Sequence, residues 1–194
     1  MSTPRIDMLQ GSLWNKILAF SLPLILTGIF EQLFNAADTL ILGRFDSAAA
    51  MAAVGNNTPL VGLIVYLFLG LSLGANVLIA QALGAGNLRA ASRTVHTAIV
   101  LAFATGIAVA LLGQFVTVPV MDWLGVPPDV LPLTTIYFRL FLLGMPFLCL
   151  YNFISAILRS RGDTRTPFYA LFEASLLNIL LDLLFVAVFG WGTA

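Results

Sequence analysis

The sequence predicts an all-α polytopic membrane protein with five transmembrane helices. Of the 194 residues, 60% are hydrophobic and 9% are charged, and the mean hydropathy is +1.00. Soluble domains carry about 25% charged residues, so this composition excludes an ordinary soluble enzyme and a disordered protein. Nine Lys and Arg residues balance nine Asp and Glu residues. A chain without net positive charge lacks the basic surface that nucleic-acid binding requires, which excludes nucleic acid as a partner.

Five segments are apolar over the length of about 20 residues that spans a bilayer. They cover residues 16–43, 59–83, 94–118, 132–158 and 167–190. Short connections separate them, so residues 1–194 are expected to form one helical bundle without a soluble domain. No cleavage site follows the first segment, which we interpret as a membrane helix that is its own targeting signal.

Small residues within these segments predict where helices pack closely. Gly70 and Gly74 lie one turn apart in the second segment. The third segment is rich in alanine and contains Gly106 and Gly113. Because apolar surface gains little by leaving lipid tails, such small residues favour helix association in membranes. Both segments are therefore expected to present close-packing faces.

Two prolines lie inside the predicted helices. Pro23 removes a backbone hydrogen bond from the first segment and predicts a bend there, and Pro146 is a weaker signal of the same kind in the fourth. Cys149 lies in an apolar run and is expected to be a buried hydrophobic residue. His96 has no companion at zinc-ligand spacing. No cofactor is expected.

Basic residues predict the orientation. One side of the predicted membrane collects Arg5, Lys16, Arg89, Arg93, Arg159, Arg161 and Arg165. The other side has Arg44, with Arg139 near the outer end of the fourth helix. Cytoplasmic loops carry an excess of Lys and Arg, so the N-terminus is expected in the cytoplasm of a multi-pass plasma membrane protein, most simply in a bacterial inner membrane. Five helices place Trp191 at the outer interface, and this odd number suggests that the natural protein continues.

Acidic residues inside the first helix are the first indication of function. Each ionisable group near the middle of a membrane costs about 2.5–3.5 kcal/mol, so it must face protein or water and marks a pathway for ions or substrate. Glu31, Asn35 and Asp38 are spaced four and three residues apart, which places them on one helix face. We expect Asp38 in the site and treat Glu31 and Asn35 as possible members.

The fifth helix repeats this spacing. Ser175, Asn178 and Asp182 share one face, whereas Glu173 lies on the opposite side of the helix and is expected to reach the cytoplasmic interface. If the first and fifth helices face each other, two carboxylates, two amides and a hydroxyl meet in one cavity. Such a cluster can hold a proton or coordinate a hard cation such as Na+. The alternative is that these polar groups only specify how the bundle packs.

At these residues the chain resembles the multidrug and toxic compound extrusion (MATE) family. Pro23 with Phe34-Asn-Ala-Ala-Asp38 resembles the family's first helix. The stretch GLSLGANVLIAQALGAG at 70–86 is similar to its second helix and the following turn. ILRSRGDTRTP at 157–167 resembles its loop between helices four and five, and Asn178-Ile-Leu-Leu-Asp182 resembles its fifth-helix pair. Together these stretches cover nearly the whole chain in the right order.

The resemblance implies twelve helices in two six-helix lobes, of which this chain supplies five helices of the N-terminal lobe. It implies a secondary active antiporter that exports organic cations or drugs in exchange for H+ or Na+ by alternating access. It also implies that the missing C-terminal lobe belongs to the same chain. Asp38, Asn178 and Asp182 would form the cation site, binding Na+ only if sodium is the coupling ion, and Pro23 the bend. Some relatives have tyrosine where this chain has Phe34, which changes the hydrogen bonding around Asp38.

Three other readings compete with the antiporter. A lipid-linked oligosaccharide flippase of the related superfamily should place basic residues in its cavity, whereas the acids found here favour cationic cargo. An intramembrane aspartyl protease would pair Asp38 with Asp182, but no Gly-x-Gly-Asp segment is present in the fifth helix. A purely structural or assembly subunit would need neither acid for transport. The sequence therefore favours a transporter over an enzyme.

Overall fold

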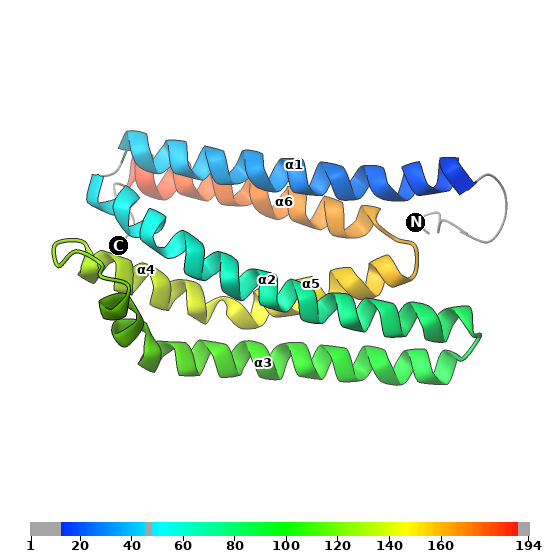
Figure 1. Ribbon diagram of the computed structural model, residues 1–194. Coiled ribbons are helices and arrows are strands. Elements are labelled where there is room, and N and C mark those ends of the chain that lie inside the picture. The colour runs from blue at the N-terminus through cyan, green and yellow to red at the C-terminus, as the bar shows by residue number, and fades with distance from the viewer. Residues whose placement is uncertain (1–12, 46–47, 190–194) are drawn as a thin grey trace.

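The structure is a computed structural model that describes residues 13–45 and 48–189 (Figure 1). Within these residues the chain is almost entirely helical and forms no strand, which confirms the predicted all-α membrane fold. The elements are α1 (Leu13–Phe45), α2 (Ala48–Gly84), α3 (Leu88–Trp123), α4 (Leu131–Leu143), α5 (Met145–Ser160), α6 (Arg165–Asp182) and the π-helix η1 (Leu183–Val188).

The helices form two layers. Helices α2 to α5 pack against one another, whereas α1 packs along α6 and η1 (Figure 1). The layers are joined where α1 contacts α2 and α5 contacts α6. Although α1 and α6 are far apart in sequence, they therefore lie side by side as a separate pair.

The fourth predicted span is a broken helix. In place of one helix over 132–158, α4 and α5 meet at Gly144 with a bend of 47°. Pro146 lies in the first turn of α5, where its missing N–H costs no helical hydrogen bond. The same missing N–H prevents α4 from continuing unbroken into α5. Within the described residues, four helices are long and apolar enough to cross a membrane, or five if the bent pair counts as one span. This agrees with the five predicted spans.

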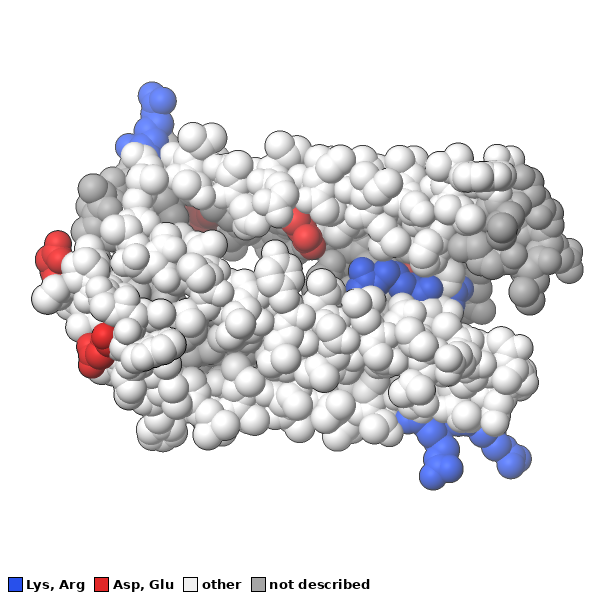
Figure 2. All heavy atoms as spheres, in the orientation of Figure 1, with Lys and Arg blue, Asp and Glu red and all other residues white. Residues whose placement is uncertain are grey.

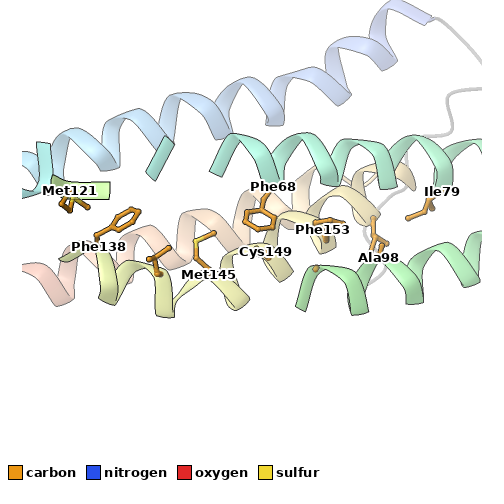
Figure 3. Packing of buried hydrophobic residues seen from close by; sticks show 11 residues of the cluster. Phe68, Ile79, Ala98, Met121, Phe138, Met145, Cys149 and Phe153 are labelled. Atoms are coloured by element: carbon orange, nitrogen blue, oxygen red, sulfur yellow. The ribbon is translucent and has the colours of Figure 1, made fainter. Parts of the chain in front are cut away.

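The core lies between α2, α3, α4 and α5. Figure 3 shows Phe68, Phe138, Met145, Cys149 and Phe153 pointing into it. Cys149 is fully buried, as expected of a small hydrophobic residue. The backbones of α3 and α5 lie close together at Gly106, where an added Cβ would lie 2.6 Å from the Cα of Pro146.

Close packing uses the predicted glycines of the third span but not those of the second. A Cβ at Gly113 would overlap the side chain of Leu142 on α4. In contrast, no described atom lies within 4 Å of a Cβ built at Gly70 or Gly74, other than the helix's own backbone and chain neighbours. The expectation that these two glycines form a helix contact within this chain is therefore wrong. They lie on the outer face of α2, which packs on α3 and α5 with its other side.

A Gly106→Ala variant is expected to be less stable than the wild type by about 1–3 kcal/mol, because the new methyl group overlaps backbone atoms that cannot rotate away. The loss should appear as a lower midpoint in thermal unfolding of the purified protein in detergent. Gly70→Ala is the matched control, since it adds the same methyl group where no described atom is close. Equal midpoints for Gly106→Ala and wild type would contradict the close approach of α3 to α5.

Basic side chains gather at one end of the described molecule. Arg89 and Arg93 follow the α2–α3 turn, and Arg161 and Arg165 lie in the α5–α6 turn. Figure 2 shows most of the visible Lys and Arg atoms toward this end, with one basic side chain at the opposite end, and acidic side chains at that opposite end and midway along the molecule. This is the grouping from which a cytoplasmic N-terminus is predicted.

Candidate functional site

The two helices that carry the predicted site lie against each other. The ring centroid of Phe30 on α1 is 5.7 Å from that of Phe168 and 5.4 Å from that of Phe172, both on α6. One turn further along, Phe34 lies 6.3 Å from Phe172. The contacts advance in the same direction on both helices, so α1 and α6 run parallel (Figure 1). The first and fifth predicted spans therefore lie against each other, while the shared polar site stays a prediction.

This register gives the level of Asp38 along α6. Asp38 is one turn beyond Phe34, and one turn beyond Phe172 is Leu176. The backbone of Asp38 therefore lies at the level between Ser175 and Asn178. Its side chain is outside the described residues, so the structure does not test its role in the site.

On α6, the half-buried polar residues lie in line with the aromatic contact. Phe168, Ser175 and Asp182 are seven residues apart and partly buried, which places them on the side of α6 that faces α1. Asn178 is exposed and lies beside this line. Asp182 is about 9 Å further along the axis than Leu176, at 1.5 Å per residue. The backbones of Asp38 and Asp182 are thus offset along the axis by one to two helical turns.

On α1, the possible site residues divide into two groups. Phe34 is half-buried and contacts Phe30 and Phe172, so it stabilises the seam between α1 and α6 rather than offering a polar group. Glu31 and Asn35 are exposed beside that seam. Helix α1 is continuous through Pro23, whose carbonyl oxygen accepts a hydrogen bond of 2.8 Å from the Thr27 hydroxyl. The bend at Pro23 stays a prediction.

The helix type changes at Asp182, a feature that the sequence does not predict. Helix α6 ends at Asp182 and the π-helix η1 begins with Leu183, in the middle of the predicted span 167–190. π-helical turns are rare and often occur at functional sites, where they re-aim neighbouring side chains. The change of helix type therefore coincides with the predicted cation ligand.

Arg159 lies one residue beyond the predicted fourth span, 132–158. In the structure it belongs to the last turn of α5 and is only partly exposed. Its Nε is buried and has no hydrogen-bond partner among the described residues. Its guanidinium is close enough to Glu31 on α1 to interact with it electrostatically. The four-residue spacing of Tyr151, Ser155 and Arg159, which places all three on one face of α5, was the available signal.

A cavity of about 250 Å³ lies between α1 and α2, beside the level of Asp38. It is lined by Thr39, Met51, Val54, Gly55 and Thr58. The described residues contain no group of three His, Cys, Asp or Glu side chains placed to hold a metal ion. Because the Asp38 side chain is not among them, the Na+ site of Asp38, Asn178 and Asp182 stays a prediction.

Comparison with known proteins agrees with this arrangement. The MatE family model matches residues 23–184. The chain is 32% identical over 183 residues to the probable multidrug resistance protein YoeA of Bacillus subtilis, covering 94% of this chain and 40% of that protein. It is 30% identical over 189 residues to an FAD transporter of Shewanella oneidensis, covering 97% of this chain and 41% of the relative.

Solved structures show the same fold. A MATE crystal structure in complex with MaD3S superposes with a TM-score of 0.90 at 25% identity, covering 100% of this chain and 43% of the other. A MOP superfamily transporter from Pyrococcus furiosus, for which a reversed polarity of the binding pocket is described, superposes with a TM-score of 0.89 at 26% identity, covering 100% and 42%.

The chain thus spans about 40% of the curated relatives it matches and 43% of the first solved structure, which corresponds to one lobe. The names of these relatives describe transporters and multidrug resistance proteins. This multi-pass membrane protein belongs to the MatE family of multidrug and toxic compound extrusion proteins.

Proposed function

We propose that this chain forms the N-terminal lobe of a secondary active efflux transporter, which exchanges H+ or Na+ for small organic cations by alternating access. The parallel contact of α1 with α6 carries the proposal, because it brings two helices with membrane-embedded acids to one seam. Names of relatives such as "probable multidrug resistance protein" support efflux of drugs.

The coupling site in this proposal consists of Asp38, Asn178 and Asp182. In a water-poor interior, carboxylates that lie close together are stabilised when a proton or a cation neutralises them. Coupling ion and cargo then compete for the same negative charge. The ion enters from outside and displaces the cargo, which leaves on that side. When the next cargo molecule binds from the cytoplasm, the ion is released to the cytoplasm. Neutralisation of Asp38 would also remove a negative charge from α1. Asp38 lies fifteen residues beyond Pro23, where the bend in this helix is predicted.

The orientation needed for export has the N-terminus in the cytoplasm of a bacterial inner membrane. Arg89 and Arg93 at the α2–α3 turn and the basic α5–α6 turn support it, because they lie at the same end of the molecule. The sixth helix of the lobe and the C-terminal lobe would complete the pathway.

The proposal is tested with the protein expressed from its own gene and reconstituted in vesicles with ethidium as the probe. An imposed pH gradient or Na+ gradient should drive ethidium movement, and the gradient that works identifies the coupling ion. A protein that moves ethidium with neither gradient, while its relatives do so in the same vesicles, would contradict cation-coupled efflux of organic cations.

A second candidate function is transport of a compound that carries negative charge. The sequence analysis discounted it because only acids were expected inside the lobe. The buried Nε of Arg159 bears on that argument, since it is a basic atom inside the described bundle. One of the curated relatives is an FAD transporter. An oligosaccharide flippase falls in the same class.

A further inference from the structure

Helix α3 presents basic side chains on its outer face, near the α2–α3 turn. Four exposed residues spaced three or four apart share this face: Arg89, Arg93, His96 and Val100. Ala98 and Ala102, on the other side of the helix, are buried in the core. In Figure 1, α3 lies at the edge of the bundle away from α1 and α6, and Figure 2 shows basic side chains projecting outward where α3 begins. The basic face therefore points away from the rest of the described chain.

An apolar groove of about 410 Å³ lies on this face, directly beyond the basic residues. It is lined by His96, Thr97, Val100, Leu101 and Ala104. Val100 is 67% exposed, so the described chain leaves this side open. The ring Nδ1–H of His96 donates to the carbonyl oxygen of Ser92 at 2.8 Å, because a carbonyl can only accept. This hydrogen bond folds the ring back along α3 toward Arg93 and leaves the groove beyond it apolar.

The length of α3 gives the depth of these residues in a bilayer. Its 36 residues extend about 54 Å at 1.5 Å per residue, whereas the hydrocarbon core is about 30 Å thick. A centred helix therefore projects about 12 Å beyond the core at each end, which is about eight residues. Arg93 then lies in the headgroup layer and Arg89 at its aqueous edge, while the groove begins at His96 where the hydrocarbon starts. Charge and apolar surface thus follow the same order as in a phospholipid.

We propose that this face of α3 binds one anionic phospholipid, with its phosphate at Arg89 and Arg93 and an acyl chain in the groove. A guanidinium presents several donors in one plane and can hold a phosphate with two parallel hydrogen bonds. Helix α3 has no acidic residue before Asp122, so its own side chains do not repel the headgroup. The lipid comes from the leaflet beside the α2–α3 turn. The inference rests on the proposed function only in that the proposed orientation makes this the cytoplasmic leaflet.

The arrangement favours an anionic lipid over a zwitterionic lipid or a soluble anion. A zwitterionic headgroup carries its own positive charge, which the two arginines repel. Inorganic phosphate can bind the arginines but has no apolar part to fill the groove. Each basic residue near an anionic membrane surface contributes about fivefold to binding, so two arginines should give a preference of about 25-fold.

The test measures lipid binding to the purified full-length protein in neutral detergent by native mass spectrometry. Phosphatidylglycerol is the anionic probe and phosphatidylcholine the zwitterionic one. The wild type should bind the first phosphatidylglycerol about 25-fold more tightly than phosphatidylcholine. Combining Arg89→Gln with Arg93→Gln should remove that preference. Ala104→Trp keeps both charges but fills the groove, so it should weaken binding of phosphatidylglycerol.

Two matched controls separate the site from general effects. Arg161→Gln with Arg165→Gln removes two exposed charges at the same end of the molecule but away from α3, and should keep the preference. Leu112→Trp adds bulk to an exposed position of α3 outside the groove and should bind both lipids as the wild type does.

Four results would overturn the site. They are equal binding of the two lipids by the wild type, an unchanged preference without Arg89 and Arg93, an equal loss in both double variants, and unchanged binding after the groove is filled. Binding in detergent requires no gradient. If the lipid results are as expected but neither gradient drives ethidium export, the proposed function fails while the lipid site stands.

Discussion

An Asp182→Asn variant is expected to lose gradient-driven ethidium export while it still inserts into the membrane. Asparagine has nearly the same shape but can neither release a proton nor present a negative charge to a cation. Interactions with charged groups contribute about 1.5–3 kcal/mol, so coupled transport should fall by about tenfold to more than a hundredfold. Asp182 is half-buried on the α1-facing side of α6 and immediately precedes η1, so it is not an ordinary solvent-exposed surface carboxylate.

Glu173→Gln is the matched control for this experiment. Glu173 lies on the same helix and loses the same charge, but it is exposed and points away from the face of Asp182. Export by Glu173→Gln should resemble that of the wild type, and both variants should reach the membrane in equal amounts. Normal export by Asp182→Asn under the same gradient would exclude Asp182 from the coupling site.

An Asp38→Asn variant separates transport from an assembly role. If Asp38 binds the coupling ion together with Asn178 and Asp182, gradient-driven export should fall as strongly as in Asp182→Asn. The double variant should then be little worse than either single variant, because residues that act as one unit are not additive. Each variant is measured for ethidium export and for the amount of folded protein in the membrane.

Asp122→Asn provides the control for Asp38→Asn. Asp122 is exposed near the end of α3, outside the α1–α6 pair, and its substitution should leave export unchanged. If Asp38→Asn exports normally, or if its only defect is a loss of folded protein, Asp38 has a structural role and the cation site needs other ligands.

The helical content and the location of the spans could be predicted from sequence because they depend on local properties. A membrane helix satisfies its own backbone hydrogen bonds, so apolar length alone identifies it. This is why the predicted segments correspond to α1, α2, α3, the α4–α5 pair and α6 with η1. The break at Gly144 was indicated by Pro146, since a missing N–H acts within one turn of the chain.

The arrangement of the candidate site was predictable only in part. Spacing of three and four residues correctly grouped Ser175 with Asp182 on one face of α6. It could not show that α1 lies beside α6, because that contact depends on Phe30 and Phe34 meeting Phe168 and Phe172 across more than a hundred residues of chain. Nor did it indicate that the π-helix begins after Asp182.

By itself, the sequence determined the class of protein, the number of spans and the polar faces that a transport site requires. Only the tertiary structure decided which faces are used. Gly106 packs against Pro146, while Gly70, an equally small residue, meets no described atom. Arg159 was predicted just beyond the fourth span, but in the structure it lies in the last turn of α5 with its Nε buried. Propensity and hydropathy act on neighbours in the chain, whereas burial and charge pairing depend on which distant helices share an interface.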